Sequence, residues 1–322
     1  MIGDWLAFKV ASTIEVKSIE VLSLVDAKVY TSKNITEFKA YCSENNIVYD
    51  SNNFKVTQKQ VLKNNYLNSA EFLLKKTVSD IKKATNCTKA LIAMGGSNGN
   101  FRDNLPLLTK YKDRSTAIRP IGLKEVRDLI EQLFDVEFSN NCEADDVISW
   151  YQYFGYENNK QIIACTEDKD ARQTSGYLYN PRKNLLEFID GFGSIELEVK
   201  VSSKNVKNYK CKGSGRMWLY YQIVCGDPVD TYNPFSKEFN ITDYKFYNLF
   251  KDIKTDKEAW ELIAKLFKSA YGNIDSWIDF KGDLNKGTWI DLLQAYVDTA
   301  FMQRWEGDRL DVPKVLTKFG II

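Results

Sequence analysis

The chain has 322 residues, of which 44% are hydrophobic and 27% are charged, as in ordinary globular proteins. It contains no histidine, which excludes Ser-His-Asp and Cys-His nucleophilic sites and every histidine-ligated metal site. The net charge of +1 requires any nucleic-acid surface to be local. The sequence has no apolar run near the ~18 residues that span a bilayer and no signal peptide at its start, so we expect a cytoplasmic protein without a membrane partner.

The first half of the chain predicts helices that alternate with short strands. The predicted elements are a helix at residues 5–12, a β-hairpin at residues 18–41, and a helix or helix pair at residues 57–84. Residues 90–94 then form an apolar run before Gly95-Gly96, a pattern typical of a buried strand followed by a turn. The polar and basic residues 101–119 come next.

The second half of the chain continues this alternation and then becomes helical. The predicted elements are helices at residues 123–134 and 144–154, a buried strand at 161–165, a hairpin spanning 178–189, and helices from residue 243 onward. Residues 218–225 fit a strand or a helix, and we favour the helix. We therefore predict an α/β fold with a mostly parallel central sheet, helices on both faces, and a helical C-terminal part. In such folds the active site lies beyond the carboxyl ends of the strands.

Three acidic clusters stand where such a site would form. They are Glu143-Ala144-Asp145-Asp146 at a helix start, Asp168-Lys169-Asp170 after the strand at 161–165, and Gly226-Asp227-Pro228-Val229-Asp230 after residues 218–225. Each cluster alone has a structural explanation, because acidic residues suit the first turn of a helix, and Asp227 and Asp230 would share one face if a helix began there. Together the carboxylates would repel one another unless cations neutralised them.

The types of ligand atom available limit which metal ions such a site could bind. The six cysteines are widely spaced and form no CxxC pair, which argues against zinc. Carboxylate oxygens select hard cations such as Mg²⁺ or Mn²⁺. Two such ions about 4 Å apart can activate water and stabilise the attacking and leaving oxygens at a phosphate.

The order and spacing of these clusters resemble the bacteriophage 5′→3′ exonucleases, the phage branch of the flap endonucleases in the PIN-like nuclease superfamily. Further segments agree with that family: Gly3-Asp4-Trp5-Leu6-Ala7-Phe8, residues 100–105 followed by Tyr111-Lys112, and Arg304-Trp305-Glu306-Gly307-Asp308. The resemblance runs from residue 3 nearly to the end of the chain. It implies an α/β nuclease domain at residues 1–230, with a hairpin insertion at about 18–56 and an arch at about 100–122, and a helical DNA-binding part at 231–322.

The resemblance also implies a two-metal phosphodiesterase that cleaves DNA at 5′ ends or flaps, with RNA–DNA hybrids as a further substrate, in phage DNA replication within the infected host. One metal would be held by Asp145, Asp146 and Asp168 with Glu143 close by, and the second by Asp170, Asp227 and Asp230. The implied catalytic residues are Asp145, Asp146, Asp168 and Lys112. The implied DNA-binding residues are Arg102, Lys110, Lys112, Arg114 and Arg119, although a solvated basic loop explains most of these charges equally simply.

Two positions depart from the family pattern. The aspartate expected before the opening glycine is Ile2, and the aspartate expected after residues 90–94 is replaced by Gly95-Gly96. A chain start placed too late would explain the first departure, whereas only divergence explains the second. Asp4 is an accessory acid that would substitute in part.

Three other functions compete with the nuclease interpretation. A non-catalytic DNA-binding protein of the same fold would bind DNA ends without metal and would not cleave them. A compact RNA-cleaving nuclease would prefer RNA, although such proteins are usually shorter. A phosphatase with an aspartyl nucleophile would explain Asp168-Lys169-Asp170 and would form a covalent phosphoenzyme.

Overall fold

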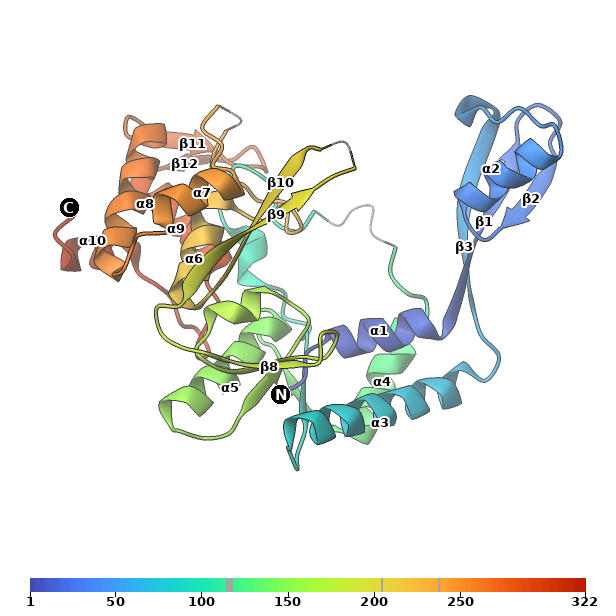
Figure 1. The fold of residues 1–322 in the computed structure, drawn as a ribbon, viewed down its shortest axis with the longest axis horizontal. Coiled ribbons are helices and arrows are strands. Elements are labelled where there is room, and N and C mark those ends of the chain that lie inside the picture. The colour runs from blue at the N-terminus through green and yellow to red at the C-terminus, as the bar shows by residue number, and fades with distance from the viewer. Residues whose placement is uncertain (114–117, 204, 237) are drawn as a thin grey trace. The chain divides into compact units, whose positions relative to one another are not determined.

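The structure is a computed structural model that describes residues 1–113, 118–203, 205–236 and 238–322. The chain divides into two compact units, each with dense internal packing (Figure 1). Unit 1 comprises Met1–Asp4, Ala84–Thr116 and Asp135–Ile322, and unit 2 comprises Trp5–Lys83 and Ala117–Phe134. The functional domain boundary predicted at residue 230 stays a prediction.

Unit 1 contains several short strands, some of them paired in parallel. The strand pairs are β4 (Leu91–Met94) parallel to β5 (Asp135–Phe138), β6 (Ile163–Cys165) parallel to β7 (Gly176–Asn180), and β7 antiparallel to β8 (Leu185–Ile189). Ile2 forms parallel bridges with both Ile92 and Cys165. Because parallel strands end at the same edge, the segments that follow β4 and β6 emerge together.

The helix α5 (Ala144–Glu157) packs on these strands and begins near that edge. Val147 and Ile148 of this helix belong to one buried cluster with Ala93 of β4 and Ala164 of β6. Every residue of β6 is buried, as expected of a strand covered on both faces. The packing therefore fixes the first turn of α5, with its acidic residues, against the strand ends.

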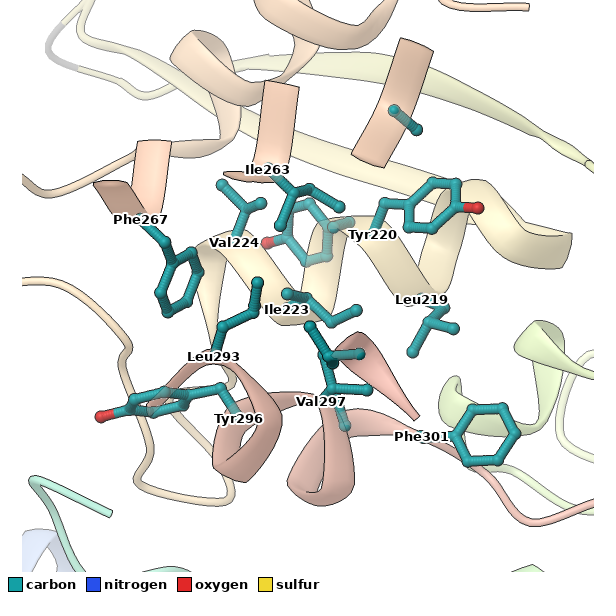
Figure 2. Packing of buried hydrophobic residues seen from close by; sticks show 14 of the residues in the cluster. Leu219, Tyr220, Ile223, Val224, Ile263, Phe267, Leu293, Tyr296, Val297 and Phe301 are labelled. Atoms are coloured by element: carbon teal, nitrogen blue, oxygen red, sulfur yellow. The ribbon is translucent and has the colours of Figure 1, made fainter. Parts of the chain in front are cut away.

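The second half of unit 1 is mainly helical. Its elements are the hairpin β9 (Ser194–Val201) and β10 (Lys207–Ser214), helices α6 (Gly215–Cys225), α7 (Asp243–Phe250), α8 (Asp256–Tyr271), α9 (Trp289–Ala300) and α10 (Val312–Lys318), and the small hairpin β11 (Ser276–Ile278) and β12 (Leu284–Lys286). Helix α6 is buried from Met217 to Val224, because it is apolar on all sides. Figure 2 shows Ile223 and Val224 of α6 among Ile263 of α8 and Val297 of α9.

Unit 2 combines helices with a small antiparallel sheet. Its elements are α1 (Trp5–Thr13), β1 (Glu15–Ser23), β2 (Val29–Ser32), α2 (Ile35–Glu44), β3 (Phe54–Leu62), α3 (Tyr66–Thr85) and α4 (Leu123–Leu133), with strand order β2-β1-β3. Phe38 of α2 packs with Ile19, Val21 and Phe54 of the sheet in a separate buried cluster. Three short 3-10 helices complete the described part of the chain: η1 (Ser51–Asn53), η2 (Phe101–Asn104) and η3 (Asp170–Gln173).

Most predicted elements are confirmed, including the strands within 90–94 and 161–165, the hairpin at 178–189 and the helices at 5–12, 123–134, 144–154 and 218–225. The hairpin predicted over 18–41 is wrong in its second part, because Asn34 caps a helix there by accepting a hydrogen bond from Glu37 N. Residues 57–62 are strand rather than helix, since they pair with β1, and the hairpin β9–β10 was not predicted. No described helix combines the length and apolar character needed to cross a bilayer.

Candidate functional site

Three aspartates from two parts of the chain meet in unit 1. Asp170 begins η3 shortly after β6, and Asp227 and Asp230 follow α6. One carboxylate oxygen of each lies within 4.8 Å of the other two. We call these residues the aspartate triad. Their oxygen donors and close spacing fit a hard divalent cation.

A tight turn brings Asp227 and Asp230 to this place. The helix α6 ends at Cys225, and Gly226 follows with φ of +68°. A Cβ on Gly226 would lie 2.3 Å from the carbonyl oxygen of Tyr232, so only glycine fits. The backbones of Asp227 and Tyr232 exchange two hydrogen bonds, of 3.0 and 3.2 Å. The helix considered from the sequence at Asp227 is therefore absent, and the turn sets the spacing of the two carboxylates.

Burial and like charge raise the pKa values of Asp170 and Asp230. The pKa of Asp170 rises to about 8, first because of burial and then because of the charge of Asp168, against the opposing charge of Lys169. Burial also raises the pKa of Asp230, and the lysine charge at position 112 opposes the shift. A cation bound among these carboxylates would relieve this repulsion.

Two lysine ammonium groups already neutralise part of the site. Lys169 Nζ lies 2.7 Å from Asp227 Oδ2. Lys112 Nζ lies 2.6 Å from Glu143 Oε1 and 3.6 Å from Asp230 Oδ2. Burial lowers the pKa of Lys112, but the charges of Glu143 and Asp230 outweigh it and leave the pKa raised, so Lys112 stays charged.

Buried amides hold Asp170 in place. Gln222 of α6 donates from Nε2 to Asp170 Oδ1 at 2.5 Å. The amide of Gln173 donates in turn to Gln222 Oε1 and, at 2.8 Å, to the carbonyl oxygen of Ala300. Gln222 is 1% exposed. No sequence pattern indicated either glutamine, because the contacts join η3, α6 and α9 only in the folded chain.

The start of α5 carries three acidic residues, Glu143, Asp145 and Asp146, which we call the helix-start group. Asp146 is fully buried and receives two hydrogen bonds from Arg102, at 2.6 and 2.9 Å. It also accepts from the backbone N–H of Glu143 at 3.0 Å in a capping box. Arg102 is 2% exposed, so its guanidinium faces this carboxylate rather than solvent. The roles implied for Arg102 on DNA and for Asp146 on metal stay predictions, and this arrangement does not favour them.

The other two members of the group face the site. Burial raises the pKa of Asp145 well above its ordinary range, and the charges of Asp168 and Glu143 raise it further. Glu143 Oε2 accepts from the hydroxyl of Tyr111 at 3.1 Å. The charges of Asp145 and Asp168 therefore repel each other, and the role of these two residues on a metal stays a prediction. Tyr111 was part of the family resemblance but had no role assigned to it.

The backbone around Lys112 is strained and tied to the turn of the triad. Lys112 and Thr231 have φ values of +48° and +60°, which is unusual for any residue with a side chain and most unusual for a β-branched one. Lys112 N donates to the Asp230 carbonyl at 2.7 Å, and Thr231 Oγ1 donates to the Lys110 carbonyl at 2.7 Å. Such strain costs roughly 1–3 kcal/mol per residue and clusters at functional sites.

The remaining predicted residues are distributed differently. The side chain of Lys110 is exposed and lies near Asp113, Arg119 is exposed in unit 2, and Arg114 lies outside the described residues. Ile2 is buried between two strands. A Cβ on Gly95 would lie 3.7 Å from Asp4 Oδ2, so the Asp4 carboxylate lies beside the position where the family pattern has an aspartate.

No family model matches the chain, and no curated protein matches it. Among solved structures, a mutant of bacteriophage T5 5′-exonuclease is similar, with a TM-score of 0.42 and 13% identity over 77% of this chain and 84% of that chain. The T5 5′-exonuclease with bound zinc gives a TM-score of 0.46 and 14% identity over 79% and 88%. A T5 flap endonuclease in a complex with DNA and metal ions gives 0.44 and 12% over 77% and 83%.

Proposed function

We propose that this protein is a metal-dependent nuclease that hydrolyses phosphodiester bonds of DNA near 5′ ends or flaps. The observation that carries the proposal is the aspartate triad, whose three carboxylates converge within 4.8 Å without a histidine in the chain. Three carboxylates held so close, two of which (Asp170 and Asp230) have a raised pKa, are stabilised by a hard cation such as Mg²⁺ or Mn²⁺.

The chain offers donors for two cations. Asp170, Asp227 and Asp230 would hold one, and Asp145 with Asp168 would hold the other. Divalent cations bound there would supply charge neutralisation at a phosphodiester and lower the pKa of water. Asp146 would be a positioning residue. Its hydrogen bonds with Arg102 fix the start of α5 and thereby the position of Asp145.

The lysines and the tyrosine orient the reacting groups. Lys112 lies between Glu143 and Asp230, where its ammonium would contact a phosphate oxygen as a point charge. Tyr111 fixes Glu143 through its hydroxyl. Lys169 holds Asp227, and Gln222 holds Asp170, so the carboxylates are positioned before substrate arrives.

A cleavage assay with a metal-binding readout tests the proposal. The protein is incubated with a 5′-labelled flapped duplex in Mg²⁺, in Mn²⁺ and in EDTA, and Mn²⁺ binding without DNA is followed by calorimetry. We expect metal-dependent cleavage that falls by roughly a thousandfold in Asp227→Asn/Asp230→Asn, together with loss of Mn²⁺ binding. The matched control replaces two exposed aspartates outside the site, Asp128→Asn/Asp252→Asn, and should behave as the natural protein. Equal cleavage by both variants would overturn the proposal.

A second candidate is a DNA-binding protein of the same type that does not cleave. The observation in its favour is the loss of two acidic positions, since Ile2 is buried in the sheet and Gly95 carries no side chain. It predicts that DNA binding persists in EDTA and that no metal produces cleavage of any of the substrates. The assay above separates the two candidates.

A further inference from the structure

A basic groove of about 420 Å³ adjoins the aspartate triad within unit 1. Its walls come from η3, from the hairpin β7–β8 and from β10. Asp168 and Lys169 line the groove, and Lys169 is the residue that bonds Asp227 of the triad. The groove therefore begins where the proposed reaction site ends.

Cations outnumber acids in this groove. The basic residues of the lining are Lys169, Arg172, Arg182, Lys183, Lys210 and Lys212, and the acidic ones are Glu167, Asp168 and Glu187. Three of the basic side chains have acidic partners, because Lys169, Arg172 and Lys212 form ion pairs. Arg182, Lys183 and Lys210 are exposed and form no ion pair within the described part of the chain.

Two hydrogen-bond donors in the lining also have no acceptor among the described residues. The indole Nε1 of Trp218 and the Nε of Arg172 are buried and unpartnered, and Trp218 as a whole is 4% exposed. Leaving a buried hydrogen-bond donor unsatisfied costs roughly 1–3 kcal/mol of stability. Such donors are therefore rare in folded proteins. Both residues line the groove, where a bound anion would lie against their side chains.

The placement of the cations favours an extended polyanion over a small ion. Lys210 and Lys212 share one face of β10, since side chains alternate along a strand. Arg182 and Lys183 lie in the turn between β7 and β8, on a different element. Charges spread over separate elements match repeated phosphates along a backbone, whereas a single small anion needs donors gathered around one point.

We propose that this groove binds the sugar–phosphate backbone of the DNA strand that passes the aspartate triad. The identification of the strand as DNA rests on the proposed function. Lysine and arginine contacts of this kind set register and affinity without reading sequence. Arg182, Lys183 and Lys210, whose side chains are exposed, would bind phosphates of that backbone.

A salt titration of DNA binding tests the groove. The variant Arg182→Gln/Lys183→Gln/Lys210→Gln removes three exposed charges of the groove, and the matched control Lys83→Gln/Lys89→Gln/Lys160→Gln removes three exposed charges outside the groove and outside the predicted DNA-binding segments. Binding of a labelled flapped duplex is measured by anisotropy in EDTA. We expect the slope of log Kd against log salt to fall by about 2–3 in the groove variant, and Kd at about 0.1 M salt to rise at least tenfold. Equal slopes in the two variants would overturn the proposal.

A neutral-backbone substrate locates the contact. Methylphosphonate linkages, which lack the phosphate charge, are placed at successive positions from the 5′ end of the duplex. They should weaken binding by the natural protein at particular positions, and the groove variant should show no further loss there, because the same contact is already gone. Additive losses at every position would contradict a direct contact.

The outcomes separate this inference from the proposed function. If the natural protein cleaves DNA and the groove variant binds like the control, the groove proposal fails while the nuclease proposal stands. If the natural protein cleaves nothing but its DNA binding depends on the groove, the groove proposal stands and the nuclease proposal fails.

Discussion

The aspartate triad and the helix-start group contain the same residue types but are stabilised in different ways. In the helix-start group, Asp146 is fully buried and receives a two-pronged bond from a buried arginine. In the triad, Asp227 has a lysine partner that is 42% exposed. The first pairing is a structural one, because both charges are removed from water and satisfy each other. The second leaves carboxylate oxygens for another cation.

This difference shows that acidic clusters which look alike in the sequence can have different roles in the folded protein. A carboxylate that pairs with a buried arginine has a structural role. A carboxylate that is buried beside other carboxylates is a candidate metal ligand. Arg102 also donates to the carbonyl oxygens of Thr299 and Phe301, so one side chain links η2, the start of α5 and the end of α9. The scaffold and the candidate metal ligands therefore meet at neighbouring residues.

The largest expected effect is on stability and comes from breaking the buried pair. Arg102→Met should lower the free energy of unfolding by about 3–5 kcal/mol, because it leaves the Asp146 carboxylate buried and uncompensated. Lys169→Met should cost less than Arg102→Met, since the Lys169 side chain is 42% exposed while its partner Asp227 is buried. Urea unfolding followed by tryptophan fluorescence measures both.

The double variant Arg102→Met/Asp146→Leu is the control for that comparison. Replacing both charges by apolar groups should recover most of the lost stability. If the double variant is no more stable than Arg102→Met, the cost lies in the lost carbonyl contacts rather than in the charge pair. If Arg102→Met is as stable as the natural protein, the distinction between the two groups is wrong.

The next effect is on catalysis and concerns Lys112, which contacts both groups. Lys112→Met should lower the single-turnover cleavage rate by roughly a hundredfold, because a positioned charge at the phosphate is lost. Lys89→Met is the matched control, since Lys89 is exposed and lies outside the site, and it should change the rate by no more than about threefold. Equal effects of the two substitutions would remove Lys112 from the site.

A smaller effect is expected in the pH dependence of stability. The folded pKa of Asp170 is about 8 against an ordinary 3.8, so between these values the folded chain holds a proton that the unfolded chain has released. Stability therefore falls as pH rises through this window. Asp170→Asn cannot ionise, so without metal its Tm should match the natural protein near about pH 4 and exceed it by a growing margin up to about pH 8.

Scanning calorimetry in EDTA across that range measures the difference in Tm. Added Mn²⁺ should raise the Tm of the natural protein more than that of Asp170→Asn, because a ligand that binds only the folded state stabilises it. Parallel pH profiles of the two proteins would mean that Asp170 is ionised without cost, and the triad would then need no cation.

The sequence was sufficient to place the acidic residues but not their partners. Asp170 follows a short apolar run and Asp145 follows a helix start, and both signals are local. The pairing of Arg102 with Asp146 joins residues 44 positions apart, and Gln222 reaches Asp170 across 52 positions. Only the packing of α6 and α5 against the strands creates these contacts, and no local pattern encodes them.

The helix that we predicted at the start of residues 57–84 was wrong for a similar reason, because a contact between distant residues decides the structure there. Residues 54–62 carry few apolar side chains, and only Phe54 among them is buried, so their alternation is weak and their lysines and glutamines suit a helix equally well. Their register against β1 over nine residue pairs decides the outcome, which is a case of tertiary pairing overriding local preference. The hairpin β9–β10 is a different case, because Ser194–Val201 alternates polar and apolar residues at every position and this local strand signal was missed.

The smallest expected effect tests whether the site extends to the end of β4. A Cβ on Gly95 would make an ordinary contact of 3.7 Å with Asp4 Oδ2, whereas a Cβ on Gly96 would lie 2.0 Å from the Ser139 carbonyl oxygen. Gly95→Asp should therefore fold and add a carboxylate beside Asp4, raising Mn²⁺ affinity by up to about tenfold, or about 1.4 kcal/mol, in calorimetric titration. Gly96→Asp, its matched control, should give little folded protein. Gly95→Asp could also fold normally and bind Mn²⁺ no more tightly. In that case the proposed metal site is limited to the aspartate triad and the start of α5, and a carboxylate at position 95 adds no metal ligand.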